Sequence, residues 1–168
     1  APKEKCEGET IFITGAGSGL GRSLAQKFAK KGAKLTLSDV NVEGLEETKG
    51  LSNRRQALIS MSTAKGSTSQ ADKIAELAAQ CKDLFGDVDI LINNAGVVQV
   101  KPITEQNEKF AGKVMAINAE CHFWLVREFI QAMMRKNSGH IVSVSSIAGI
   151  AGTPGMTDYC ASKFAAYG

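Results

Sequence analysis

The chain has 168 residues, 43% hydrophobic and 22% charged, and its 20 Lys and Arg against 17 Asp and Glu leave a net charge of +3. This is the composition of an ordinary soluble globular protein, and the length fits a single domain over residues 1–168. The basic residues are scattered and not interleaved with aromatic side chains, so no nucleic-acid partner is expected. No apolar run reaches the ~18 residues that a membrane span needs, so no span is expected.

The four cysteines lie far apart in the sequence, without the paired spacing of a metal site, and the chain has only two histidines. Cysteines of this kind are typical of buried thiols in a reducing compartment. Residues 1–5 lack the apolar core of a signal peptide. The sequence therefore predicts a cytoplasmic or other intracellular location and no bound metal.

Strands and helices alternate along the chain. Short apolar runs predict strands at 11–13, 34–38, 57–61, 88–92 and 141–144. Apolar residues at helical spacing predict helices at 20–28, 41–47, 74–84, 110–129 and around 159–163. The polar segment 60–69 is predicted to be a surface loop. This alternation implies a doubly wound α/β fold of the Rossmann type, with a parallel sheet between two layers of helices.

A cluster of glycines joins the first strand to the first helix. Glycine suits a turn that approaches a phosphate, because a Cβ would keep the backbone N–H groups away and the following helix N-terminus adds partial positive charge. A strand before the turn and a helix after it are the context that a dinucleotide site requires. The predicted cofactor-binding residues of this turn are Gly15, Gly17, Ser18, Gly19, Leu20 and Gly21. The alternative is a turn with a structural role only.

Asp39 ends the second predicted strand, about 20 residues after the first glycine, where an acidic residue meets the adenosine ribose in dinucleotide sites. Its carboxylate is placed to accept hydrogen bonds from the ribose hydroxyls and to repel a 2′-phosphate. No Arg adjoins it, and Ser18 rather than a basic residue precedes Gly19. These features favour NAD over NADP. The alternative is a solvated strand-end Asp that caps a turn.

Tyr159 and Lys163 are four residues apart, which places them on one face of a helix. A phenol with a pKa of about 10 exchanges protons poorly at neutral pH unless a cation stabilises the phenolate, and Lys163 is placed to do so. This spacing alone is common on helix surfaces.

Taken together, the motifs of the chain resemble those of the short-chain dehydrogenase/reductase family. They are Thr14-Gly15-x-x-x-Gly19-x-Gly21, Asn93-Asn94-Ala95-Gly96 after the fourth strand, Asn118 in the long helix, Ser145-Ser146 after the fifth strand and Tyr159-x-x-x-Lys163. Their order and spacing match the family over nearly the whole chain. The resemblance implies an NAD-dependent oxidoreductase that moves a hydride between the nicotinamide and an alcohol or carbonyl substrate.

The resemblance implies catalytic roles for four residues and cofactor contacts for two of them, Tyr159 and Lys163, and for Asn94. Tyr159 is the implied general acid/base, while Lys163 lowers the pKa of that tyrosine and binds the nicotinamide ribose. Ser146 is implied to hold the substrate oxygen, and Asn118 to mark a backbone disruption where a water relays protons to Lys163. Asn94 is implied to lie near the adenosine ribose. Taken alone, Ser146 also suits a turn cap and Asn118 a buried side chain bonded to the backbone.

The segments 139–144 and 158–166 resemble the branch of the family that contains retinol dehydrogenases and 17-beta-hydroxysteroid dehydrogenases. That branch implies a lipophilic, retinoid-like or steroid-like substrate. Its members often carry a hydrophobic N-terminal membrane anchor, which this sequence does not show. The family resemblance also suggests a homodimer or homotetramer built on the faces of the long helix.

The sequence departs from the family pattern at two places. No acidic residue stands at 61–62 or 67–68, where members bind the adenine edge with an Asp. The sequence ends at Gly168, just after Lys163, so the later strands of the family's sheet and much of the substrate pocket are missing. We therefore expect an incomplete enzyme with its fifth strand at an exposed edge. The alternative hypothesis is a non-catalytic NAD-binding or interaction module that arises from truncation.

Overall fold

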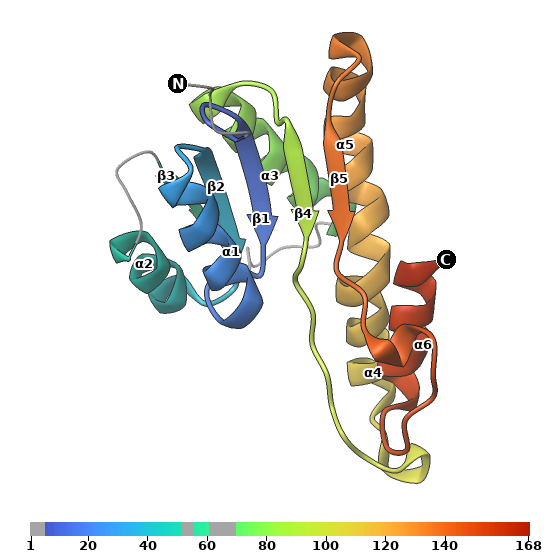
Figure 1. Ribbon diagram of the computed structural model, residues 1–168. Coiled ribbons are helices and arrows are strands. Elements are labelled where there is room, and N and C mark those ends of the chain that lie inside the picture. Colours follow the sequence, from blue (N-terminus) through green and yellow to red (C-terminus); the bar gives the residue numbers. More distant parts are fainter. Residues whose placement is uncertain (1–5, 52–55, 61–69) are drawn as a thin grey trace.

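The computed structural model describes residues 6–51, 56–60 and 70–168. The strands of these residues form one five-stranded sheet in the order β3-β2-β1-β4-β5, with every neighbouring pair parallel (Figure 1). The strands are β1 (Thr10–Thr14), β2 (Lys34–Asp39), β3 (Gln56–Ser60), β4 (Ile90–Asn93) and β5 (His140–Ser143). The predicted parallel sheet is confirmed, with β5 at an edge.

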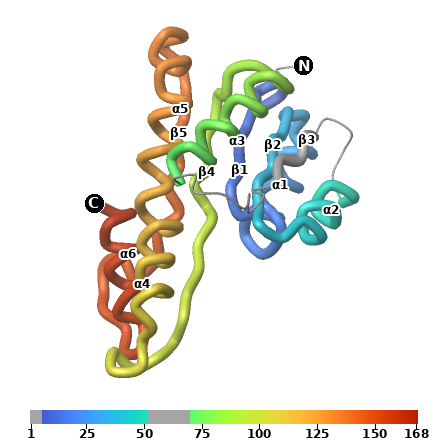
Figure 2. The backbone as a smooth tube through the Cα atoms, turned by 180° about the vertical axis from the view of Figure 1, so that it is seen from behind, coloured from blue at the N-terminus to red at the C-terminus, as the bar shows by residue number. Residues whose placement is uncertain are grey.

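The helices form a layer on each face of the sheet (Figures 1 and 2). The face shared by α1 (Gly19–Lys30) and α2 (Val42–Gly50) is opposite to the face covered by α3 (Gln70–Phe85) and α5 (Cys121–Lys136). Two more helices, α4 (Glu108–Met115) and α6 (Thr157–Tyr167), pack together beyond the carboxyl ends of β4 and β5. Short 3-10 turns occur at Ile103–Glu105 and Ile147–Gly149. The predicted three-layer arrangement is confirmed.

The side chains of β1 explain why the sheet is covered on both faces. Ile11 and Ile13 pack in the core on the α1 side, with Ala25 of that helix. Phe12 points to the opposite face, where its ring centroid lies 5.2 Å from that of Phe129 in α5. Because both faces of the strand are buried, its sequence is a continuous apolar run rather than an alternating one.

The ends of several elements follow from side-chain hydrogen bonds. Asn41 caps α2 as predicted, because its side chain accepts a hydrogen bond of 3.1 Å from the N–H of Gly44. At the other end of the sheet, β4 begins at Ile90 rather than at residue 88. The carboxylate of Asp89, just before β4, accepts a hydrogen bond of 2.9 Å from the N–H of Thr10.

The helix predicted at 110–129 is interrupted at Asn118, where the family resemblance implied a backbone disruption. A π-helical turn, Ala116–Glu120, separates α4 from α5, with the buried Asn118 at its centre. The side chain of Asn118 accepts a hydrogen bond of 2.8 Å from the N–H of Val97 and donates one of 2.9 Å to its carbonyl oxygen. A π turn adds one residue to the helix. The apolar residues keep a spacing of three or four on either side of it, so the sequence pattern resembles that of a single helix.

The chain between β4 and α4 runs well beyond the sheet and reaches the start of α6 (Figure 1). The N–H of Lys101 donates to the carbonyl oxygen of Gly155 at 2.8 Å, and the Gln99 amide donates to Asp158 at 2.7 Å. The surface loop predicted at 60–69 falls, apart from residue 60, outside the described residues. Among the helices that the structure does describe, none has the length and apolar character that crossing a bilayer requires.

Phe129→Ala is expected to lower the free energy of unfolding by about 3–5 kcal/mol, because it leaves a cavity against Phe12 in the core. The matched control is Phe123→Ala on the same helix, where the side chain is 67% exposed and a change below about 0.5 kcal/mol is expected. Urea unfolding followed by circular dichroism measures both values. Equal losses in the two variants would contradict the packing described here.

Candidate functional site

A cleft of about 330 Å³ opens at the carboxyl edge of the sheet, between the ends of β1 and β4. The strand order reverses between these two strands, which is where doubly wound sheets bind their ligands. Its polar part is formed by the glycine turn, the end of β2 and the residues after β4, and its apolar wall comes from α3 and α5. The described lining residues are Thr14, Gly15, Ser18–Gly21, Asp39, Val40, Gln70, Ile74, Leu77, Asn94–Val97, Ile117, Cys121 and Leu125.

The glycine turn is held against the end of β4 by Asn94. The Asn94 side chain donates to the carbonyl oxygens of Thr14 at 2.9 Å and Gly15 at 3.1 Å. Gly15 has a φ of +65°, and a Cβ there would lie 2.8 Å from the Cα of Ala95; a Cβ on Gly21 would lie 2.7 Å from the Asn94 Nδ2. These close approaches exclude any side chain at the two glycines.

The first turn of α1 faces the cleft with Ser18, Gly19, Leu20 and Gly21, as the sequence predicted. That turn contains no acidic residue, so the partial positive charge of the helix N-terminus is available for an anion. The turn therefore suits the diphosphate of a dinucleotide.

Asp39 lies at the end of β2 and lines the same cleft. One of its carboxylate oxygens accepts a hydrogen bond of 2.8 Å from the N–H of Gly17, and the other accepts one of 2.9 Å from the N–H of Asn41. Gly17 itself is buried behind Asp39 and outside the lining of the cleft. Any effect of Gly17 on a ligand in this cleft therefore acts through Asp39.

The positions 61–62 and 67–68, where the sequence lacks the expected acidic residue for adenine, lie outside the described residues.

Lys163 and Tyr159 lie on α6, as predicted, outside the lining of the cleft. The Lys163 ammonium is buried, donates to the Val144 carbonyl oxygen at 2.8 Å, and is 5.8 Å from the centroid of the Tyr159 ring. Burial lowers the pKa of Lys163. The carbonyl oxygen of Lys163 in turn accepts a hydrogen bond of 2.9 Å from Ser145, which fixes α6 against the segment after β5.

Asn118 and Lys163 meet at Gly96, which lines the cleft. A Cβ on Gly96 would lie 3.5 Å from the Asn118 Oδ1 and 3.6 Å from the Lys163 Nζ. Asn118 also donates a hydrogen bond of 3.0 Å to Ser162, one turn from Tyr159. The predicted backbone disruption at Asn118 is therefore present and joins the cleft to α6.

Ser146 caps the 3-10 turn that packs against α6. Its hydroxyl oxygen accepts a hydrogen bond of 3.2 Å from the N–H of Ala148, so the turn-capping role considered for this residue is observed. A serine hydroxyl retains its own proton as a donor in this arrangement.

Asp158 is a residue of this region that sequence reasoning missed. It is buried, and its carboxylate accepts hydrogen bonds from Gln99 at 2.7 Å, from Gln106 at 3.4 Å and from the N–H of Tyr159 at 2.8 Å. These contacts tie the long segment after β4 to the first turn of α6. The sequence does show an Asp in the first turn of the predicted helix, which favours a helix start. Its glutamine partners are far away in the sequence, so their hydrogen bonds to Asp158 could not be predicted.

Two further titratable groups lie close to Lys163. Burial raises the pKa of the Cys121 thiol to about 12, which makes this cleft residue an inert thiol at neutral pH. Burial, assisted by the charge of Lys163, lowers the pKa of His122 to about 4.

Over residues 6–51, 56–60 and 70–168, no group of three His, Cys, Asp or Glu side chains is placed to hold a metal ion.

Residues 9–168 match the family model described as short chain dehydrogenase, so the chain belongs to this family. Members of the family use a nicotinamide cofactor. The site fits a nicotinamide dinucleotide. The absence of side chains at Gly15 and Gly21 lets a ligand approach the backbone of the turn, and Asp39 at the end of β2 lines the same cleft.

Similar proteins come from the predicted branch. The chain is 42% identical over 167 residues to epidermal retinol dehydrogenase 2 of Homo sapiens, 45% identical over 170 residues to short-chain dehydrogenase/reductase family 16C member 6 of Bos taurus, and 40% identical over 170 residues to estradiol 17-beta-dehydrogenase 11 of Homo sapiens. These matches cover 99% of this chain and 54%, 53% and 55% of the relatives. The chain thus spans about half the length of the curated relatives it matches.

The fold is also shared with solved structures. The chain superposes on levodione reductase with a TM-score of 0.87 and 28% sequence identity, covering 96% of this chain and 63% of that one. The predicted family, branch and fold class are confirmed.

The low pKa of His122 makes stability depend on pH. In the unfolded chain the imidazole has a pKa of 6.5 and in the folded protein about 4, so between these values the unfolded state binds more protons. The contribution of His122 to the free energy of unfolding is therefore fully present above pH 6.5 and is lost as the pH falls toward 4. His122→Gln is expected to remove up to about 3 kcal/mol of the loss in unfolding free energy between pH 7 and pH 4.

Urea unfolding at a series of pH values measures this difference. His140→Gln is the matched control, because His140 is exposed on β5. A His122→Gln profile parallel to that of the unmodified chain would contradict the assignment.

Proposed function

We propose that this chain provides the cofactor-binding and proton-transfer parts of an NAD-dependent oxidoreductase that interconverts an alcohol and a carbonyl compound. The convergence of Gly96, Asn118 and Lys163 carries the proposal, because it connects the dinucleotide-type cleft to the helix that bears Tyr159. A nucleotide-binding module alone has no need for a buried lysine at that junction.

We assign NAD as the preferred cofactor on the basis of Asp39. Its carboxylate has one N–H on each oxygen, which leaves lone pairs for the two ribose hydroxyls of the adenosine. A 2′-phosphate placed there would meet a like charge. The described lining of the cleft contains no Lys or Arg to offset that repulsion.

The proposed chemistry assigns proton transfer to α6. When bound, the nicotinamide supplies the hydride acceptor or donor. In alcohol oxidation, the Tyr159 phenolate takes the substrate's hydroxyl proton, and in reduction the Tyr159 hydroxyl group gives its proton to the carbonyl oxygen. Lys163 stabilises the phenolate by its charge, which acts strongly because the ammonium is buried. Ser146 donates a hydrogen bond to the substrate oxygen, and Asn118 fixes the backbone beside Lys163.

We propose a lipophilic substrate. The curated relatives are named for retinol and estradiol, both lipophilic alcohols. The two segments that follow β4 and β5 carry exposed apolar side chains: Val98, Val100, Ile103, Ile147 and Ile150. Such side chains suit an apolar ligand rather than a charged one.

Tyr159→Phe is expected to lower kcat/KM for NAD-dependent oxidation of a hydrophobic secondary or allylic alcohol by roughly 10²–10⁴-fold, because the general acid/base is lost. The measurement is NADH formation by the full-length protein that carries this sequence. Tyr167→Phe on the exposed part of α6 is the control and is expected to keep the unmodified rate. Cofactor binding without any turnover would instead favour the non-catalytic module.

Asp39→Asn is expected to weaken NADH binding by roughly 10–100-fold, because hydrogen bonds to a charged acceptor are lost, and to weaken NADPH binding much less. Calorimetric titration with each cofactor gives both dissociation constants. The control is Asp83→Asn, an exposed aspartate on α3. An unchanged preference between the two cofactors in Asp39→Asn would rule out the assigned role of this residue.

A further inference from the structure

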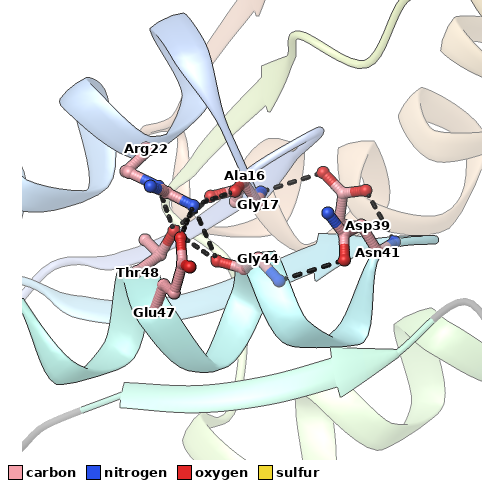
Figure 3. Close-up of polar contacts among 8 residues, drawn as sticks. All are labelled: Ala16, Gly17, Arg22, Asp39, Asn41, Gly44, Glu47 and Thr48. Carbon is pink, nitrogen blue, oxygen red and sulfur yellow. Dashed lines mark hydrogen bonds and ion pairs between the residues drawn. The ribbon is translucent and has the colours of Figure 1, made fainter.

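Arg22 lies in the first turn of α1, yet its side chain points toward α2 and takes no part in the lining of the cleft (Figure 3). Its Nη2 donates to the carbonyl oxygen of Gly17 at 2.5 Å, to that of Gly44 at 3.3 Å and to the Glu47 carboxylate at 2.7 Å. Its Nε donates to the Thr48 hydroxyl oxygen at 3.1 Å. One guanidinium therefore joins the glycine turn to α2.

Thr48 extends this link to the preceding peptide of the turn. Its hydroxyl oxygen lies 2.9 Å from the carbonyl oxygens of both Ala16 and Gly44. The N–H of the same Ala16–Gly17 peptide donates to the carboxylate of Asp39 at 2.8 Å. The peptide is thus held at its carbonyl by α2 and at its N–H by the acid that faces the cleft (Figure 3).

Gly17 lies against Asp39 so closely that a Cβ there would require Asp39 to shift by a few tenths of an ångström. A Cβ on Gly17 would lie 3.0 Å from both the Cγ and one carboxylate oxygen of Asp39. The orientation of the carboxylate therefore depends on the orientation of this peptide, and a rotated peptide would present a carbonyl oxygen to Asp39 in place of an N–H.

We propose that Arg22 is a positioning residue for cofactor selectivity. With Thr48, it keeps the carbonyl oxygens of Ala16 and Gly17 on the α2 side, so that the Gly17 N–H stays on Asp39 and the carboxylate is fixed to receive a ribose hydroxyl. The inference rests on the proposed function. It adds a determinant of the preference for NAD over NADP that does not touch the cofactor.

The chemistry of arginine suits this task. The planar guanidinium presents several N–H groups in a fixed fork, so it serves the carbonyl, the hydroxyl and the carboxylate at once. Glu47 accepts one of these hydrogen bonds, and the charge of Arg22 is directed to α2 rather than offered to a 2′-phosphate. Because the Glu47 side chain is 66% exposed, the ion pair itself contributes little to holding the turn.

The test compares the dissociation constants of NADH and NADPH by calorimetry for the unmodified chain and its variants. Arg22→Met is expected to reduce the preference for NADH about tenfold, the size expected for one lost hydrogen bond to a charged group. Arg22→Lys restores part of the preference, since an ammonium reaches one carbonyl but lacks the fork. Losses of affinity common to both cofactors cancel in this ratio, so general loosening of the turn does not move it.

Two further variants separate the causes. Thr48→Val keeps the shape of the side chain and is expected to reduce the preference about threefold, as for one neutral hydrogen bond, even if Arg22→Met does not fold. Glu47→Gln is expected to change the preference by less than about twofold, as for an exposed ion pair. Arg127→Met, which removes an exposed arginine of α5, is the matched control.

An unchanged preference in Arg22→Met and Thr48→Val would overturn the inference, as would a loss in Glu47→Gln equal to that in Arg22→Met. Absence of NADH binding by the unmodified chain would overturn the proposed function and this inference with it. Normal binding by the unmodified chain, with the ratio unchanged in the variants, would overturn only the role of Arg22.

Discussion

The Asn94 side chain donates to the carbonyl oxygens of Thr14 and Gly15, and this contact joins the carboxyl ends of β1 and β4. The strand order reverses between those strands, so an opening there is a natural consequence of the topology. The Gly15 carbonyl and the Asn94 amide occupy the space that a Cβ of Gly21 would need, so α1 begins close to the end of β4. Together with the bonds of the Thr14 hydroxyl to Ile92, Asn94 and Ala95, this contact holds the glycine turn and the helix N-terminus at the end of β4.

The part of the site on α6 depends on two buried charged side chains, Lys163 and Asp158, that are both hydrogen-bonded. On α6, Lys163 reaches the Val144 carbonyl oxygen after β5, and Asp158 is bonded to Gln99 after β4. A buried charge is costly unless it is paired or hydrogen-bonded, and these hydrogen bonds offset the cost of burying both charges. The two segments that leave the sheet are thereby attached to the same helix, which places Tyr159 relative to the end of the sheet.

The sequence predicted the motifs of the site, but it could not predict the distant partners of Asp158 and Arg22. The glycine turn and Asp39 are recognisable because a strand, a turn and a helix follow one another within about 30 residues. The partners of Asp158 lie far along the chain, and only the folded loop brings them together. Arg22 resembles an ordinary solvent-exposed helix residue in sequence, because its acceptors belong to α2. The spacing around Asn118 predicted one helix, because apolar residues recur every three or four positions on both sides of the π turn.

The extra residue of the π turn lets α4 and α5, which follow one another along one helical segment, pack against different neighbours. In an α-helix each residue turns the direction of its side chain by about 100°, so one residue added at the π turn shifts the apolar stripe around the axis by that amount. Before the turn, α4 packs against α6; after it, α5 packs against α3 and the sheet. Without the added residue the two stripes would stay aligned. The π turn at Asn118 therefore rotates the apolar face of α5 relative to that of α4. As a result, α5 covers the sheet while α4 packs against α6 beyond it.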